Sequence, residues 1–338
     1  MTMDDRRKRV NIKDVARLAG VSPTTVSHAL GGQRPVSEAT RARVQEAVEQ
    51  LGYRPHPGAR SLKSSGTGVI ALCAVNATSD SPYANLEYYF RLMQSVTEVA
   101  HEEGYALVEV PSQNSDRYWD RLLVDGAVVS DPVAGDPNLA FLRGQGLPYV
   151  TTGRDPDAPE AGYWVDDDND VETRAMLDHL LAHGAADITL VTWLTTDFWT
   201  RAGIAAYRAW CDEHGMTARI EEVRDQDDDP LEAAARRLLE GPHRPDAVYG
   251  LYEEPAIALL RRATELGIKV PEELMVAGPG DFGLAVKNTP QMTTLEYDIE
   301  SQGRAAARML IRLIRGAPVE KPHQIVDFSI AERDSTRR

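Results

Sequence analysis

The sequence predicts an α/β protein that joins a small all-α headpiece to a core of two doubly wound parallel sheets. Three observations lead to this fold class. The first 64 residues carry twelve Lys/Arg and six Asp/Glu, a net charge of +6, whereas the rest of the 338-residue chain carries −21. That basic segment has the pattern of three short helices. From residue 69 onward, short apolar runs alternate with amphipathic stretches, as in parallel sheets with crossover helices.

The first two helices of the basic segment are joined by a tight turn. The first is expected over residues 12–19, with Asn11 as its N-cap. Residues 20–22 form the turn, and Ser22 caps the second helix. Pro23 then occupies the first helical position, where its missing N–H has no cost. This arrangement is a helix-turn-helix.

The second helix is expected to separate an inner from an outer face. It runs to about Leu30, and steps of 100° per residue place Val26 and Leu30 on the inner face. Thr24 and His28 then point outward as an i, i+4 pair. Two further hydroxyl side chains flank this pair, namely Thr25 and Ser27. A basic unit with such a polar face suits the major groove of DNA, where hydroxyls reach phosphates and His28 reaches base edges.

The third helix and the segment after it complete the headpiece. Ser37 caps this helix, Gly52 ends it, and Val44, Val48 and Leu51 line its inner face. The following sequence, RPHPGARSLKSSGTG, is rich in Pro, Gly and Ser and is typical of a linker. A single helical turn over 57–62 is possible within it.

The remaining ~270 residues are too many for one small doubly wound sheet, so two sheet units with a cleft between them are expected. The expected strands contain the runs VIALCAV, ALVEV, DGAVVS, YVTTG, DITLVTW, AVYGLY and LMVAG. The expected helices cover residues 86–103, 171–183, 201–214, 231–239, 255–266 and 299–314.

Several function classes are disfavoured by the sequence. There is no apolar run of the roughly 20 residues that a membrane helix needs, and the N-terminus lacks the apolar stretch of a secretory signal. Cys73 and Cys211 are expected to be two buried thiols, which fits a cytoplasmic location. Walker A, GxSxG and strand-linked GxGxxG motifs are absent, so we expect no enzyme and no cofactor.

The stretch NIKDVARLAGVSPTTVSHALGGQRPVSEATRARVQEAVEQLGYRP resembles the DNA-binding headpiece of the lactose-repressor (LacI) family, and GARSLK resembles its hinge helix. TTVSHAL and ARSLK are most similar to the purine-repressor branch. The resemblance continues through weaker, ordered motifs such as LLVDGAVV, RAGIAAYRAW and PDAVYGLYEE to the terminal AERDSTRR. It covers almost the whole chain.

The resemblance implies a transcriptional regulator, most simply a repressor, that binds a pseudo-palindromic operator as a homodimer. DNA contacts are expected at Asn11, Ser22, Thr24, Thr25, Ser27 and His28 of the headpiece and at Ala59, Leu62 and Lys63 of the hinge. By family position, Leu62 wedges between the central base pairs and kinks the duplex. An effector bound in the core is expected to change the spacing of the hinges and hence the DNA affinity, which is allosteric control.

The domain plan that the resemblance implies has a headpiece at 1–54, a hinge helix and linker at 55–66, and an effector-binding and dimerisation core at 67–338. The core is similar to periplasmic sugar-binding proteins. Its N-subdomain is expected to comprise about 67–165 plus 298–326, and its C-subdomain about 166–297 plus 327–338. The chain lacks the extra leucine heptads that make some family members tetramers, so a dimer is expected.

Effector contacts are expected where this chain matches the family. Arg201 aligns with the family's effector-binding arginine, whose planar guanidinium donates to hydroxyls or carboxylates. Tyr88 and Tyr89 align with an aromatic pair at the start of the first core helix. Asp131 ends a strand at the edge where open α/β sheets bind ligands.

Other expected contacts fall where the chain departs from the family. Tyr252 and Glu253 replace the usual Asn-Asp or Gly-Asp, and Asp281 lies one place beyond the family's acid. The usual aromatic floor has no counterpart, and aromatic residues around Trp193, with Phe198 and Trp199, offer another wall. These departures leave the effector as a sugar or nucleoside-like molecule whose identity is open.

Two polar clusters are expected to have ordinary roles. We expect solvated loops at the two acidic runs, Asp166–Asp168 and Asp227–Asp229. The first run also precedes a helix, whose N-terminal dipole favours negative side chains. His179 and His183 are an i, i+4 pair without an HExxH motif or a carboxylate nearby in the sequence, so surface or packing roles are expected and no metal. The alternative function is a small-molecule-binding protein or enzyme on the same core without operator-specific DNA binding, which leaves the headpiece unexplained.

Overall fold

The computed structural model describes residues 10–31, 36–53, 66–73, 86–111, 115–224, 226–280 and 285–338. The chain divides into two compact units, Met1–Thr67 and Gly68–Arg338. The helical turn expected over 57–62 lies outside the described residues.

The first unit contains the three expected helices, α1 (Ile12–Ala19), α2 (Pro23–Gly31) and α3 (Glu38–Leu51). The side chain of Asn11 accepts a hydrogen bond from the Lys13 N–H and thereby caps α1. Gly20 ends α1 with a φ of 64°, a left-handed conformation that a side chain disfavours. The side chain of Ser37 caps α3. These caps confirm the predicted helix boundaries.

The headpiece core confirms the expected burial of Val26 and corrects that of Leu30. The fully buried side chains are Val15, Ala16, Ala19, Val26, Val44 and Ala47. Leu30 is 37% exposed, whereas Ala29 packs against this cluster. The inner face of α2 is therefore centred between Val26 and Ala29, and this rotation turns Leu30 toward solvent.

The first sheet of the second unit is wholly parallel, with the strand order β11-β5-β4-β3-β1-β2. Its strands are β1 (Val69–Cys73), β2 (Ala106–Val110), β3 (Gly126–Ser130), β4 (Tyr149–Thr152), β5 (Trp164–Asp166) and β11 (His323–Ile325). The last strand comes from near the C-terminus, so both ends of this unit contribute to one sheet.

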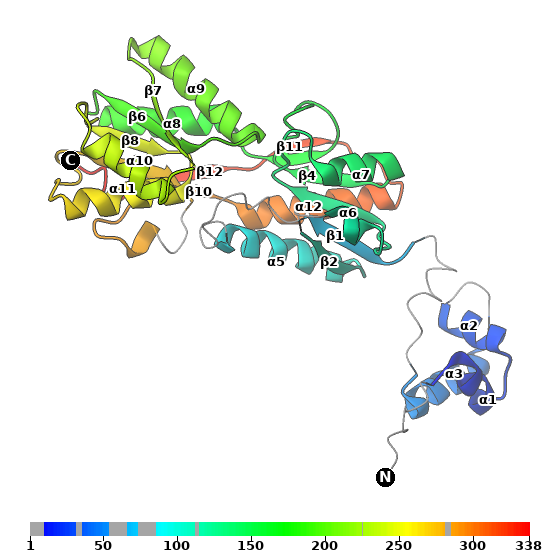
Figure 1. The fold of residues 1–338 in the computed structure, drawn as a ribbon. Coiled ribbons are helices and arrows are strands. Elements are labelled where there is room, and N and C mark those ends of the chain that lie inside the picture. Colours follow the sequence, from blue (N-terminus) through cyan, green and yellow to red (C-terminus); the bar gives the residue numbers. More distant parts are fainter. Residues whose placement is uncertain are drawn as a thin grey trace. The chain divides into compact units, whose positions relative to one another are not determined.

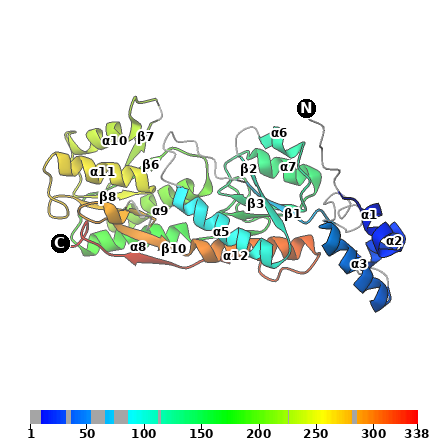
Figure 2. The same ribbon diagram turned by 90° about the horizontal axis from the view of Figure 1, so that it is seen from below.

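Helices cover both faces of this sheet. On one face α5 (Leu86–Glu102) and α12 (Ile299–Ile314) lie side by side, and Ile70 and Leu72 of β1 pack into their cluster (Figures 1 and 2). Ala71 and Cys73 point to the opposite face, toward α6 (Ser115–Trp119) and α7 (Pro137–Gln145). Alternate residues of a strand face opposite sides, so a strand buried on both sides is continuously apolar.

The second sheet has the order β12-β10-β9-β8-β6-β7, and only its edge strand β12 is antiparallel among the described pairings. Its strands are β6 (Ile188–Trp193), β7 (Arg219–Val223), β8 (Ala247–Gly250), β9 (Met275–Pro279), β10 (Thr293–Tyr297) and β12 (Phe328–Ala331). The helices α8 (Asn169–Ala182) and α9 (Phe198–His214) pack on one face, and α10 (Pro230–Leu239) and α11 (Glu253–Glu265) on the other. A short 3-10 turn follows at Ala285–Lys287.

Three connections pass between the sheets. The chain leaves the first sheet after β5, returns between β10 and α12, and leaves again between β11 and β12. Cys73 and Cys211 are buried free thiols, as predicted. Among the described residues, every helix is too short or too polar to cross a membrane.

Candidate functional site

The polar side chains at the start of the headpiece helices hold the helix-turn-helix together. Asn11 forms a capping box with Asp14, whose carboxylate accepts the Asn11 N–H at 3.0 Å. Ser22 Oγ accepts the Thr25 N–H at 3.0 Å and lies 2.9 Å from the Thr25 hydroxyl. Asn11, Ser22 and Thr25 therefore fix the geometry of the predicted DNA-binding face.

The outer face of α2 carries the side chains that are predicted to contact DNA. Thr24 is exposed, and Ser27 and His28 are half-buried, while Val26 on the other side of the helix is fully buried. This is the expected orientation of the i, i+4 pair. The expected hinge contacts Ala59, Leu62 and Lys63 lie outside the described residues.

In the second unit, Asp131 lies just after β3 at the carboxyl edge of the first sheet. Its backbone is unusual, because φ is 42°, a conformation that non-glycine residues rarely adopt. Ser130 Oγ donates to its carboxylate at 2.9 Å. Gly153 follows β4, and a Cβ there would lie 2.8 Å from Asp131 Oδ1. The absence of a side chain at Gly153 therefore lets the strained Asp131 fit.

Tyr88 joins this site from α5. Its hydroxyl donates to Gln302 Oε1 of α12 at 3.4 Å and also lies within hydrogen-bonding reach of Asp131. Burial raises the pKa of Asp131 to about 7, partly countered by the hydrogen bond from Ser130. Burial, with the charges of Asp131 and Asp167, holds the pKa of Tyr88 well above its usual range. Two predicted effector residues, Tyr88 and Asp131, are therefore neighbours.

Buried carboxyl groups extend the site along the junction between the sheets. Asp166 and Asp167 are 4% and 8% exposed, so the expectation of a solvated loop is wrong for both. Burial raises the pKa of Asp166 to about 6, opposed by the nearby Arg154 guanidinium. Burial and then Glu172 raise the pKa of Asp167 well above its usual range. Asp168 has the expected helix-start role, because its side chain caps α8.

A further buried carboxyl group, Glu172, lies on the first turn of α8. It is 1% exposed, and neither carboxyl oxygen has a hydrogen-bond partner among the described residues. Burial, followed by the charges of Asp166 and Asp168, raises its pKa to about 9. Two more buried oxygen atoms, Asn169 Oδ1 and the Tyr297 hydroxyl, also lack a hydrogen-bond partner in the part of the chain described. We refer to Tyr88, Asp131, Asp166, Asp167, Asn169, Glu172 and Tyr297 as the junction cluster.

A second group of side chains gathers at the carboxyl edge of the second sheet. The Tyr252 hydroxyl, just after β8, lies 2.7 Å from Thr200 Oγ1 and donates to Asp197 at 3.2 Å. Asp197 caps α9 through the Thr200 N–H at 2.7 Å, so this helix starts at Phe198 rather than at the expected residue 201. The charge of Asp197 also raises the pKa of Asp131, so charged groups at the edges of the two sheets lie close enough to interact.

Three predicted effector residues lie outside both of these groups, namely Arg201, Trp193 and Glu253. The Arg201 side chain is exposed, and its nearest polar contact is the Pro156 carbonyl at 3.5 Å. Trp193 packs into the apolar cluster beneath α10 and α11. Glu253 Oε1 accepts the Ala285 N–H at 3.1 Å and so anchors the short turn at 285–287.

Tyr89 and Asp281 complete the predicted set. Tyr89 faces β2, where burial and then Glu109 raise the pKa of its hydroxyl, on a different side of α5 from the junction cluster. Asp281 lies outside the described residues. The effector roles of these residues and of Arg201, Trp193 and Glu253 remain predictions.

Sequence reasoning missed Arg154, which bridges the two halves of this unit. Its guanidinium carbon lies 4.4 Å from the Trp164 ring centre and 4.9 Å from that of Phe198, and its Nε donates to Asp166 at 3.1 Å. Among the aromatic residues that were expected to form a wall of the effector site, Phe198 contacts the Arg154 guanidinium. Trp199 donates to the Leu251 carbonyl and contacts the Tyr297 ring edge-on. The aromatic signal was present, but its cationic partner is 44 residues away in sequence.

A helix-turn-helix headpiece followed by two Rossmann-like sheets with polar groups at their facing edges defines a DNA-binding regulator with a small-molecule-binding core. The family model for bacterial regulatory proteins of the lacI family matches residues 11–56, and the model for a periplasmic binding protein-like domain matches residues 177–336. The chain belongs to the LacI family of bacterial regulatory proteins.

Relatives match along the full length. The HTH-type transcriptional regulator CelR of Thermobifida fusca is 29% identical over 98% of this chain and 99% of its own length. The repressor PurR of Aliivibrio salmonicida is 27% identical, over 97% and 98%, and the ribose operon repressor of Escherichia coli K12 is 28% identical, over 96% and 99%.

Two solved structures support the fold. A CelR–cellobiose complex, 27% identical, covers 97% of this chain and 100% of its own with a TM-score of 0.70. A Lac repressor dimer bound to operator and an anti-inducer covers 97% and 99%, with 21% identity and a TM-score of 0.82. The second, at this identity, shows the fold alone.

Proposed function

We propose that this protein is a transcriptional repressor that binds a pseudo-palindromic DNA operator as a homodimer under the control of a small-molecule effector. The observation that carries the proposal is the headpiece, in which a capped helix-turn-helix exposes Thr24 and half exposes His28 on one polar face. Neither an enzyme nor a transport protein has a use for that face. A cytoplasmic location follows from the proposed access to the chromosome.

The proposed division of labour follows the domain plan of headpiece 1–54, hinge 55–66 and core 67–338. Two headpieces read successive major-groove half-sites, and Leu62 of each hinge enters the minor groove between them. The sequence supports the electrostatics, because the first 64 residues carry +6 and the remainder carries −21.

The proposed effector site lies at the two facing sheet edges. These edges hold the junction cluster, which includes Tyr88 and Asp131, and Tyr252. Strand orders of this type bind ligands at the carboxyl edge, where the order reverses. The exposed Arg201 is proposed to close on the ligand from α9. A sugar or nucleoside-like effector suits these groups, because its hydroxyls donate to carboxyls and accept from tyrosines. The CelR–cellobiose complex and the name of the ribose operon repressor support a polyhydroxy ligand.

DNA recognition is tested by selecting binding sequences from a random duplex library and measuring affinity by fluorescence anisotropy. We expect enrichment of one palindromic sequence and an affinity that falls steeply with salt. The Leu62→Ala variant should bind the selected operator but bend it less, as judged by energy transfer between its ends. Enrichment of no sequence, or binding indifferent to sequence, would contradict the proposal.

The effector is sought by thermal shift of the full chain against sugars, disaccharides, nucleosides and small acids. A true ligand raises the melting temperature with concentration, and an Asp131→Asn variant should weaken that response. A matched control is Asp120→Asn, an exposed aspartate outside the site. A ligand that shifts both variants like the parent protein binds elsewhere.

A further inference from the structure

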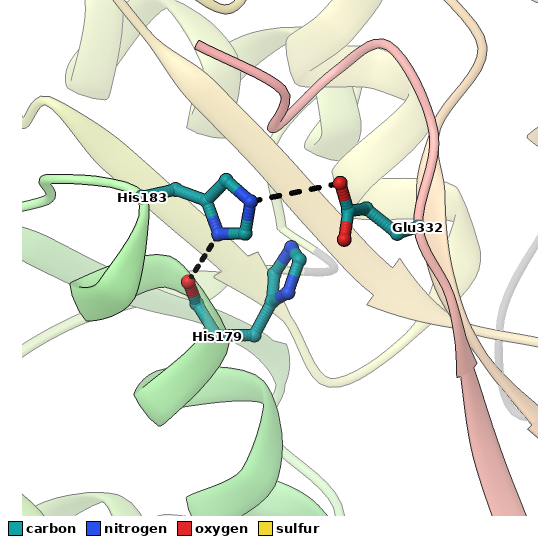
Figure 3. Close-up of side chains that lie close together, drawn as sticks. All are labelled: His179, His183 and Glu332. Atoms are coloured by element: carbon teal, nitrogen blue, oxygen red, sulfur yellow. Dashed lines mark hydrogen bonds and ion pairs between the residues drawn. The ribbon is translucent and has the colours of Figure 1, made fainter.

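We propose that His179, His183 and Glu332 form a binding site for a divalent transition-metal ion of the zinc type. His179 lies in the last turn of α8, His183 is the C-cap of that helix, and Glu332 directly follows β12. One ligand atom from each residue lies within 4.8 Å of the other two. Figure 3 shows the three side chains close together. The sequence offered no carboxylate for this pair because Glu332 is 149 residues downstream of His183.

The distances fit tetrahedral coordination after small side-chain movements. Ligand atoms about 2.0–2.1 Å from Zn²⁺ at tetrahedral angles are separated by about 3.3 Å. His183 Nε2 and Glu332 Oε1 are 3.6 Å apart. The two imidazole rings have centres 4.2 Å apart and are tilted by 40°, so their nitrogens can turn toward one point. Three protein ligands leave the fourth position to water.

His183 already has the partner that metal-binding histidines use. Its Nδ1 lies 2.8 Å from the His179 backbone carbonyl, which only accepts hydrogen bonds, so Nδ1 carries a proton. In the neutral ring, Nε2 then presents a lone pair toward the Glu332 carboxylate, which also presents lone pairs. Two acceptors at 3.6 Å repel unless Nε2 is protonated or a metal cation lies between them. A metal ion provides that cation and keeps the orienting Nδ1–H bond.

His179 is a suitable second ligand because a hydrogen bond fixes the position of its ring. Its Nε2 lies 2.8 Å from the Thr336 hydroxyl, and Thr336 is fully buried and also bonded to Thr293. The ring is therefore held against the C-terminal segment that carries Glu332.

Arg337 is the competitor that a metal must overcome. Its Nε donates to Glu332 Oε1 at 3.2 Å. The Arg337 side chain is 58% exposed, so it can swing into solvent at little cost. The bound ion would tie the C-terminal segment to the end of α8 and stabilise the second sheet unit.

The experiment uses the full chain, stripped with a chelator and titrated with Zn²⁺ by calorimetry and with Co²⁺ by visible absorption. We expect one equivalent of either ion to bind, the tetrahedral absorption of Co²⁺, and a Zn²⁺-dependent rise in melting temperature. His183→Gln and Glu332→Gln should each weaken binding about 100-fold or more, since even outer partners of a bound metal contribute about 10–100-fold.

His214→Gln is the matched control. His214 also lies at a helix end with Nδ1 2.8 Å from the carbonyl four residues earlier, but it belongs to no metal-type group among the described residues. This variant should bind Zn²⁺ like the parent. The proposal is overturned if no stoichiometric binding occurs, or if folded His183→Gln binds Zn²⁺ as tightly as His214→Gln does. In that case the His183–Glu332 contact is an ordinary ion pair of a protonated histidine.

Discussion

Replacing Glu172 with glutamine should stabilise the protein at neutral pH. Glu172 is 1% exposed, and its carboxyl oxygens have no partner among the described residues. Burial raises its pKa from 4.5 to about 9, with Asp166 and Asp168 adding to the effect. Glutamine has nearly the same shape as the protonated acid and never ionises, so the variant removes the ionisation penalty and little else.

The size and sign follow from proton linkage. Between pH 4.5 and about 9 the folded protein binds a proton at Glu172 that the unfolded chain releases, so the free energy of unfolding falls as pH rises. At about pH 7.5 the loss amounts to three pH units of 1.36 kcal/mol, or about 4 kcal/mol. Below pH 4.5 both states are protonated and the penalty vanishes. Glu172→Gln should therefore recover about 4 kcal/mol at pH 7.5 and little at pH 4.5.

Thermal unfolding of the full chain across this pH range measures the effect. At about 2 °C per kcal/mol for a unit of this size, the variant should melt about 8 °C higher than the parent at pH 7.5. Glu102→Gln, which changes an exposed glutamate of α5, is the control and should follow the parent at every pH. The reasoning fails if Glu172→Gln and Glu102→Gln show the same pH profile.

Three further changes test the headpiece, the second sheet edge and the packing of α12. His28→Ala should cost about 1–3 kcal/mol of operator affinity and relax base preference at one half-site position, which binding to single-base operator variants would reveal. Tyr252→Phe should cost about 1 kcal/mol of stability through the lost bond to Asp197 and should weaken the effector-dependent thermal shift; an unchanged shift would place the effector elsewhere. Gly303→Ala should destabilise the core by about 1–3 kcal/mol, because its Cβ would collide with Ser95 Oγ, and adding Ser95→Ala should recover part of the loss in denaturation measurements.

The headpiece was predictable because its determinants are local. Asn11 and Ser37 lie within three residues of the N–H groups they cap, and Gly20 and Gly52 lie next to the helices they end. Such short-range signals can be read from one sequence without knowing the fold. Leu30 was assigned wrongly because the packing of α2 against its neighbours, which sequence does not contain, sets the centre of its buried face.

The junction cluster was only partly predictable because its members come together through the crossovers. Asp131 could be found from its place after a strand. Tyr88 was expected from the family resemblance. Glu172 gave no signal, since an acid on the first turn of a helix is ordinarily a solvated group that favours the helix N-terminus. Its burial follows from the packing of α8 against β8, where Tyr249 is also fully buried. Composition counts such a carboxyl but does not show whether water reaches it.

The formal charge of −15 therefore overstates the negative charge of the folded protein at neutral pH. Glu172, with a pKa of about 9, holds its proton there, and Asp131, with a pKa of about 7, is about half ionised. An effector that donates hydrogen bonds to these carboxyls favours their charged forms, lowers their pKa values and releases protons. Its affinity must then rise with pH, whereas the affinity of an effector that accepts hydrogen bonds from the protonated carboxyls must fall. The sign of that pH dependence thus distinguishes a donor-rich ligand from an acceptor-rich one at this site.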